Sequence, residues 1–164
     1  MSAGFLSRLV GAKHAPQDAS DGAGAGPAYP VRKSEAEWKA DLSPEQFQVL
    51  RKHGTERPFT HPLNDEKRVG RFHCAGCGAP LFDSATKFES GSGWPSFYEP
   101  LDGAVGTSVD HVLLSPRTEV HCAQCGGHLG HVFEDGPAPT GQRYCMNGTA
   151  MAFDPADGEA SGRG

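Results

Sequence analysis

The sequence has no long hydrophobic run and no excess of basic residues. No apolar stretch approaches the roughly 20 residues that a membrane-spanning helix needs. Lysine and arginine total 15 against 20 acidic residues, and the net charge of -5 argues against a nucleic-acid-binding surface. Hydrophobic residues make up only 37% of the chain, whereas glycine (22) and proline (13) are frequent. We therefore expect a small core and many loops, in a domain of the kind that a metal or disulfides often stabilise.

The two ends of the chain differ in composition from its middle. Residues 1–30 are rich in glycine, alanine, serine, aspartate and proline, and residues 154–164 are again polar and rich in glycine. We expect both to be disordered tails that flank one domain at residues 31–153. The apolar residues near the start are too few for a secretory signal. We therefore expect a cytoplasmic monomer, and a transit peptide within residues 1–20 is the alternative to a simple tail.

Two helix starts precede the main part of the domain. Ser34 with Glu37 and Ser43 with Gln46 each form a capping-box pattern, and a proline follows the second serine at the first helical position. Gly54 is a natural stop for the second helix. We expect this helix to pack on the main domain.

From residue 71 onward the pattern changes to short apolar or β-branched runs separated by glycine, proline and aspartate. Closely spaced short strands are typical of an antiparallel, mainly β protein and not of βαβ units. The expected strands cover residues 71–74, 80–82, 105–109, 112–114, 118–122, 131–133, 143–146 and 150–153.

Four of the five cysteines occur in two matched His-Cys-x-x-Cys-Gly segments. Cys74 and Cys77 lie in the first segment, and Cys122 and Cys125 lie in the second. Together they supply the four thiolates of a closed structural zinc site, which would join two distant hairpins. Two redox-active pairs or two disulfides are the alternatives, but metal binding is favoured in a chain without a secretory signal.

Cys145 is the cysteine that has no partner in the sequence. It lies between Arg143 and Asn147 in a segment that favours a strand, so the three side chains should share one face. A guanidinium beside a thiol favours the reactive thiolate, which makes Cys145 a candidate nucleophile. The alternative is a buried structural cysteine in a core strand.

Trp94 lies in the glycine-rich segment 91–97, where it could form a flat apolar wall for a ligand. The alternative is that it covers the core.

His131, Phe133 and Asp135 would share one face of a strand and could form one side of a pocket that donates and accepts protons. His128 has the opposite parity unless a bulge lies at the glycine two residues later. The alternative is that these histidines simply mark a polar strand end.

Taken in order, these segments closely resemble those of the methionine sulfoxide reductase B family. The matching motifs are the two C-x-x-C pairs, G-S-G-W-P-S-F, H-L-G-H-V-F-x-D-G-P and R-Y-C-M-N. The resemblance covers about residues 34–153. It implies a mainly β fold of two antiparallel sheets, sandwich-like or barrel-like, with short N-terminal helices and a zinc-stapled pair of hairpins.

The resemblance implies reduction of methionine R-sulfoxide in oxidised proteins. Cys145 matches the family's nucleophile, which attacks the sulfoxide sulfur and becomes a sulfenic acid. The residues that match the family's substrate pocket are Trp94, His128, His131, Phe133, Asp135, Arg143 and Asn147. The four paired cysteines match the zinc site that some members carry.

The chain departs from the family pattern at Ser92, where many members carry a resolving cysteine. If zinc holds the four paired cysteines, none is free to form a disulfide with Cys145. The resemblance then implies that an external thiol, from thioredoxin or from glutathione with glutaredoxin, reduces the sulfenic acid.

The leading hypothesis is therefore a thiol-dependent reductase. The alternative is a zinc-stapled binding module in which Trp94 and Phe133 form an aromatic ligand cage, as the two matched cysteine pairs alone would suggest. Turnover of a methionine sulfoxide by the wild-type chain distinguishes the two.

Overall fold

The structure, a computed structural model, describes residues 29–110 and 116–156. The expected strand at 112–114 and most of the two expected tails lie outside these residues. The unit that begins at Val31 contains all the helices and strands discussed below. None of the helices in the described ranges combines the length and the apolar character that a membrane crossing requires.

The two predicted helices are present, and both capping boxes are confirmed. Helix α2 spans Glu35–Asp41 and helix α3 spans Pro44–Lys52. At each start a serine hydroxyl accepts from the N3 backbone N–H, and the N3 side chain accepts from the serine N–H. The end of α3 differs slightly from the prediction, because the left-handed residue is His53 (φ 59°) and not the following glycine.

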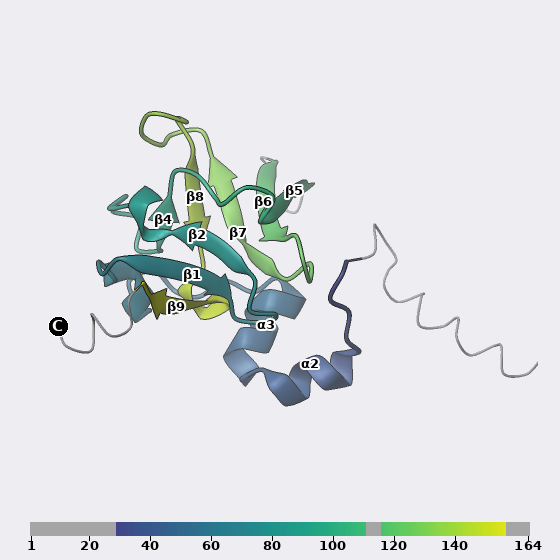
Figure 1. The fold of residues 1–164 in the computed structure, drawn as a ribbon. Coiled ribbons are helices and arrows are strands. Elements are labelled where there is room, and N and C mark those ends of the chain that lie inside the picture. The colour runs from purple at the N-terminus through teal and green to yellow at the C-terminus, as the bar shows by residue number, and fades with distance from the viewer. Residues whose placement is uncertain (1–28, 111–115, 157–164) are drawn as a thin grey trace, which may run out of the picture. The chain divides into compact units, whose positions relative to one another are not determined.

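Within the described residues, nine strands form two antiparallel sheets, which confirms the predicted fold class (Figure 1). The three-stranded sheet has the order β2-β1-β9, and the six-stranded sheet has the order β3-β4-β8-β7-β6-β5. The strands are β1 (Gly70–Cys74), β2 (Pro80–Asp83), β3 (Lys87–Phe88), β4 (Ser96–Phe97), β5 (Val105–Asp110), β6 (Arg117–Cys122), β7 (His128–Phe133), β8 (Arg143–Met146) and β9 (Met151–Pro155). Three single-turn 3-10 helices complete the list, namely η1 (Pro62–Asp65), η2 (Ser84–Thr86) and η3 (Gly148–Ala150).

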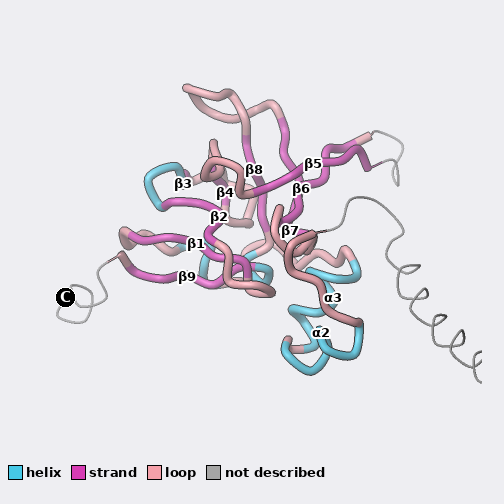
Figure 2. The backbone as a smooth tube through the Cα atoms, turned by 45° about the vertical axis from the view of Figure 1, so that its right-hand side comes forward, coloured by secondary structure: helices cyan, strands magenta, loops and turns pink. Residues whose placement is uncertain are grey.

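The strand predictions differ from the structure mainly at short elements and at boundaries. Strands β3 and β4 were not expected, because two residues each are too few for a periodic pattern in a segment rich in glycine, serine and proline. Strand β7 starts three residues before the expected strand, and β9 continues through Pro155. Figure 2 shows how short the strands are beside the loops that join them.

Three buried phenylalanines hold the two sheets together. Phe72 of β1 and Phe82 of β2 face Phe97 of β4, and none of the three is exposed to solvent. The rings of Phe82 and Phe97 stack with centroids 4.2 Å apart, and Phe72 meets Phe97 edge-on at 5.0 Å. Aromatic pairs of this kind add about 0.5–1.5 kcal/mol beyond the area that they bury. This contact fixes β4, and therefore its neighbour β8, against the smaller sheet.

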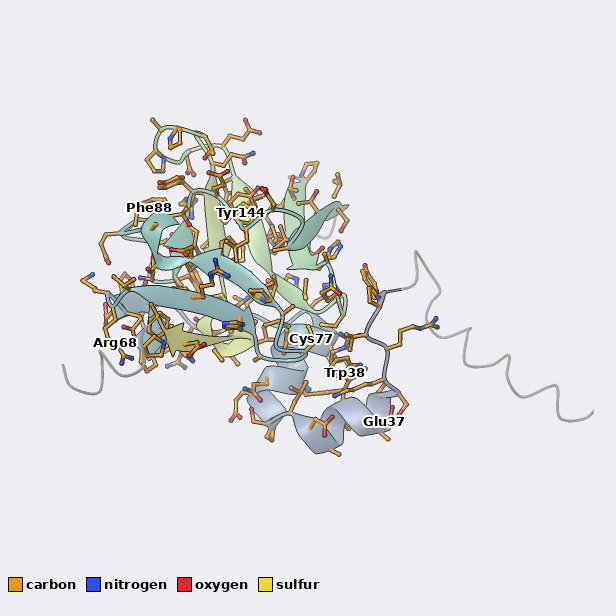
Figure 3. The ribbon with its side chains drawn as sticks, in the orientation of Figure 1. Glu37, Trp38, Arg68, Cys77, Phe88 and Tyr144 are labelled. Carbon is orange, nitrogen blue, oxygen red and sulfur yellow. The ribbon has the colours of Figure 1, made fainter. Side chains whose placement is uncertain are left out.

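The helices pack at the turns that carry the paired cysteines. The buried ring of Trp38 lies beside the turn of Cys77, as Figure 3 shows, and a Cβ at Gly76 would be 3.3 Å from that ring. Arg51 of α3 stacks over the same ring and donates to the Cys125 carbonyl at 3.0 Å. The expectation that α3 packs on the main domain is confirmed.

Candidate active site and four-cysteine cluster

The two C-x-x-C-Gly segments fold into the same turn. In the first, the N–H of Gly78 donates to the Cys74 carbonyl at 2.8 Å, and in the second Gly126 donates to Cys122 at the same distance. Both glycines have a left-handed backbone, with φ of 83° and 76°. Glycine adopts this conformation without steric cost, which explains its place after each pair. One turn follows β1 and the other follows β6, so the pairs come from different sheets.

The four sulfurs of these turns meet in one cluster. The Sγ atoms of Cys74 and Cys125 are 3.7 Å apart, those of Cys77 and Cys122 are 3.6 Å apart, and all four lie within 4.8 Å of one another. A disulfide requires about 2.05 Å, so the cysteines are free thiols. Tetrahedral zinc with Zn–S bonds of about 2.3 Å separates its sulfurs by about 3.8 Å. The donor set and its spacing therefore fit a metal site.

Backbone amides also point at this cluster. The N–H groups of Gly76, Gln124 and Gly127 donate to Cys74, Cys122 and Cys125 sulfurs at 3.3–3.4 Å. Such donors stabilise thiolate charge, which a metal site with four cysteines requires.

Cys145 lies on β8, between β4 and β7. It pairs with Ser96 on one side and with His131 on the other. The neighbour of His131 must be glycine, because a Cβ at Gly130 would collide with the carbonyl oxygen of Cys145. The close approach of β7 and β8 therefore brings His131 and Cys145 directly opposite each other on the same face of the sheet.

A pocket of about 400 Å³ opens at Cys145. Its lining combines β8 and the residue after it, the second half of β7, the start of β6, the glycine-rich loop before β4 and the loop after α3. The lining residues are Thr55, Ser92, Trp94, Arg117, Gly130, His131, Phe133, Arg143, Cys145 and Asn147. The predicted common face of Arg143, Cys145 and Asn147 is confirmed, and so is the position of Trp94 at a cavity and not only over the core.

Several of these side chains have fixed orientations. The Trp94 indole N–H donates to the Glu56 carbonyl at 3.0 Å. The Asn147 amide donates to the Leu129 carbonyl and accepts from the Glu56 N–H, both at 2.9 Å. The Arg143 guanidinium lies over the Phe133 ring, 4.5 Å from its centroid. These contacts pre-organise both the apolar and the polar side of the pocket.

Two predicted pocket residues do not line this cavity. Asp135 is exposed and forms a two-pronged ion pair with Arg143, with N–O distances of 2.9 and 3.1 Å. His128 is buried, because the ring of His53 stacks on it at 4.8 Å, and it touches the pocket only through the ring of His131, 5.5 Å away. Each of them therefore contacts a residue that lines the cavity, Arg143 for Asp135 and His131 for His128.

The bulge that would turn His128 to the side of His131 is present. Along β6 the pairing advances by one residue, from Val120 to His121, while along β7 it moves by two, from Gly130 to His128. The extra residue of β7 changes the parity of the strand. The two histidines consequently share a face despite their spacing of three.

Glu119 is the important buried residue that the sequence pattern missed. Val120 and Cys122 lie on the buried face of β6, so the alternation of a strand predicts that Glu119 is exposed on the opposite face. Its side chain is in fact only 5% exposed. Its oxygens accept from His128 at 2.9 Å and from His121 at 3.0 Å. Burial acts to raise the pKa of this carboxyl, but the hydrogen bonds, including one from a serine of β5, outweigh it and hold the pKa at about 2.

Glu119 and His128 also form, with His53, a group of three potential metal ligands within 4.8 Å. Both carboxylate oxygens already accept hydrogen bonds, and the imidazole rings of His53 and His128 are stacked. The arrangement is that of a satisfied buried carboxylate that holds His128 in place.

The thiol of Cys145 does not have the low pKa that its arginine neighbour suggested. Burial raises the pKa, and the Ser92 hydroxyl and the Arg143 guanidinium lower it by less. The Asp135 carboxylate adds to the rise, because it pairs with that guanidinium and opposes its field. The predicted effect of Arg143 is present, because its guanidinium lowers the pKa of the thiol, but burial raises that pKa by more. The sequence pattern shows the arginine but not the burial of the sulfur.

Comparison with known proteins defines the class of this fold and site. Residues 42–155 match the family model described as the SelR domain. The chain is 56% identical over 126 residues to the peptide methionine sulfoxide reductase MsrB of Agrobacterium fabrum, which covers 76% of this chain and 93% of that protein. The MsrB of Pseudomonas putida is 57% identical over 129 residues (78% and 97% covered), and that of Methanosarcina mazei is 54% identical over 124 residues (75% and 89%).

The match extends over most of the chain and nearly the whole length of these relatives. The chain therefore belongs to the peptide methionine sulfoxide reductase MsrB family and is an oxidoreductase. This membership favours the enzyme over the alternative of a zinc-stapled binding module.

The Glu119 network predicts a specific pH dependence of stability. Because the folded-state pKa (about 2) lies below the ordinary 4.5, the carboxylate stabilises the fold above pH 4.5, and this stabilisation is lost as the pH falls toward 2. Glu119→Gln should lower the free energy of unfolding at pH 7 by about 3 kcal/mol. Urea denaturation of the wild type and the variant at pH 7 and pH 3 measures this difference in the free energy of unfolding.

The exposed Glu99→Gln is the control and should change little at either pH. If the loss of unfolding free energy in Glu119→Gln were as large at pH 3 as at pH 7, the low pKa assigned to Glu119 would be contradicted.

Proposed function

We propose that this chain reduces methionine R-sulfoxide in proteins to methionine and that Cys145 is its nucleophile. The observation that carries the proposal is the position of this thiol. The other four cysteines form a cluster, whereas Cys145 lies at a pocket with apolar rings on one side and polar groups on the other. A methionine sulfoxide side chain has the same two parts, an apolar methyl group and a polar S–O bond.

The proposed reaction balances without any other group. The Cys145 sulfur bonds to the sulfoxide sulfur, the sulfoxide oxygen takes a proton, and the oxygen passes to Cys145 as the sulfide leaves. The thiol is oxidised to a sulfenic acid, and the sulfoxide is reduced to methionine. In the overall balance, the proton that the sulfoxide oxygen takes is the one that the Cys145 thiol held at the start. A raised pKa of Cys145 fits this scheme, because a neutral thiol brings that proton into the pocket.

The pocket residues have distinct proposed roles. The Trp94 ring is the wall for the methyl group, and Phe133 supports the same side. Arg143 and the second amide hydrogen of Asn147 are donors for the sulfoxide oxygen. His131 lies opposite Cys145 and is the group that transfers the proton.

His128 and Asp135 are proposed to act indirectly. Asp135 orients the guanidinium of Arg143 through their two hydrogen bonds. His128, held by Glu119, supports the ring of His131 from behind.

We further propose that an external thiol reduces the sulfenic acid. The hydroxyl of Ser92 lies 3.8 Å from the Cys145 sulfur, at the position that a resolving cysteine would occupy, and a hydroxyl cannot form a disulfide. A first thiol would form a mixed disulfide with Cys145 and release water, and a second would free the enzyme. Thioredoxin, or glutathione with glutaredoxin, supplies such thiols in the cytoplasm, where we place this protein as a monomer.

The four-cysteine cluster is proposed to bind a structural zinc ion. Four thiolates leave no open coordination position, so the ion would take no part in the reaction. It would hold the ends of β1 and β6 together, and with them the two sheets.

Cys145→Ser tests the nucleophile. With dabsyl-methionine-R-sulfoxide and dithiothreitol, turnover should fall at least about a thousandfold, because a hydroxyl is a far weaker nucleophile toward sulfur. The variant should keep the wild-type melting temperature, since serine differs from cysteine by one atom of similar size. Retained turnover would exclude Cys145 from the chemistry.

A single oxidative turnover tests the absence of an internal resolving thiol. Wild-type enzyme treated with one equivalent of sulfoxide and no reductant should carry one added oxygen atom on Cys145, detected by mass spectrometry. Ser92→Cys is the control, because there the same treatment should give a disulfide in place of the added oxygen. A disulfide between Cys145 and any wild-type cysteine would refute the external route.

Metal removal tests the cluster. Wild-type protein should contain one zinc per chain by elemental analysis, and Cys125→Ser should lose it. The free energy of unfolding should fall by on the order of 5 kcal/mol or more, since structural zinc contributes roughly 10–16 kcal/mol in small domains. Cys145→Ser should keep both the metal and the stability. A zinc-free wild type of equal stability would rule out the structural ion.

A further inference from the structure

Phe59 combines two unfavourable features at one position. Its side chain is 69% exposed, and its backbone has a φ of 64°. A bulky residue in the left-handed region is rare, and its backbone is strained there. Val69 and Val109 are the other large exposed apolar side chains in the described part of the chain, and neither has a positive φ. Strain of this kind persists only where the surroundings hold the residue, and it concentrates at functional sites.

The surroundings of Phe59 hold it tightly. Its N–H donates to the Gly93 carbonyl at 2.7 Å. A Cβ at Gly93 would be 2.7 Å from both the Phe59 ring and the Pro58 side chain. The ring can therefore pack this closely only because residue 93 has no side chain. Glu56, three residues earlier, accepts backbone hydrogen bonds from Gly148 and Thr149 at 2.8 and 2.7 Å. The ring is thus presented to solvent from a rigid loop.

This loop adjoins the rim of the Cys145 pocket. Gly93, on which the ring rests, lies between Ser92 and Trp94, and both of these line the cavity. Thr55, at the start of the same loop, lines it too. The indole of Trp94 is tied to the loop through the Glu56 carbonyl. Phe59 therefore stands beside the mouth of the pocket and outside the cavity itself.

A polypeptide substrate must cross this rim. The pocket accommodates one side chain, so the main chain and the neighbours of an oxidised methionine pass over the residues around the mouth. An exposed aromatic ring that is already ordered binds an apolar side chain at little cost in conformational entropy. We propose that Phe59 binds an apolar side chain adjacent to the oxidised methionine in polypeptide substrates. This inference rests on the proposed function of the pocket.

The test compares substrates with and without such a neighbour. Phe59→Ala should lower kcat/KM about tenfold, through KM, for a short peptide in which leucines flank methionine R-sulfoxide. It should leave N-acetyl-methionine-R-sulfoxide unchanged within about twofold, and a glycine-flanked peptide should behave like that small substrate. Dithiothreitol serves as reductant throughout, so that no protein reductant contributes to KM.

Two further variants separate recognition from folding. Phe59→Gly removes the ring and also relieves the left-handed strain, so it should show the same peptide defect with an undiminished melting temperature. Val69→Ala removes an apolar side chain of similar exposure and should leave kcat/KM unchanged for every substrate tested.

Three results would overturn the inference. These are an equal loss for the small substrate and the leucine peptide, no loss for either, or a defect seen only when thioredoxin replaces dithiothreitol. Failure of the proposed function is distinguishable, because the wild-type enzyme would then turn over none of the sulfoxides.

Discussion

The meeting of four cysteine sulfurs between the two sheets is the constraint on which the rest of the structure depends. Cys74 and Cys77 follow a strand of the smaller sheet, whereas Cys122 and Cys125 follow a strand of the larger one. A domain with so few hydrophobic residues buries little apolar surface, and a link between distant segments adds stability that the core lacks. The helices pack on the same turns through Trp38, so the cluster organises both the sheets and the N-terminal segment.

The candidate active site lies in the larger sheet and depends on how closely its strands approach. Gly130 lets β7 pass against the backbone of Cys145, which sets His131 opposite the sulfur. The same closeness buries the thiol and raises its pKa, against the pull of Arg143.

Much of the architecture could be predicted because its signals are local. Capping boxes, C-x-x-C-Gly turns and the shared face of Arg143 and Cys145 each depend on a few consecutive residues. Strands β3 and β4 escaped prediction, because two-residue strands exist only through their partners. Glu119 escaped because its strand pattern indicates an exposed face, and that face is covered by histidines from distant segments.

Four features of this protein follow from its residues alone: the mainly β class, the four paired cysteines, the lone thiol at Cys145 and the motifs of its family. Each of these features depends only on residue type and on spacing along the chain, both of which can be read directly from the sequence. Three features became visible only in the folded molecule: His128 and Asp135 lie outside the cavity and contact residues that line it, burial raises the pKa of Cys145, and Phe59 is exposed beside the pocket. The physical reason is that burial, electrostatic environment and exposure depend on which distant segments come together, and no local pattern contains that information.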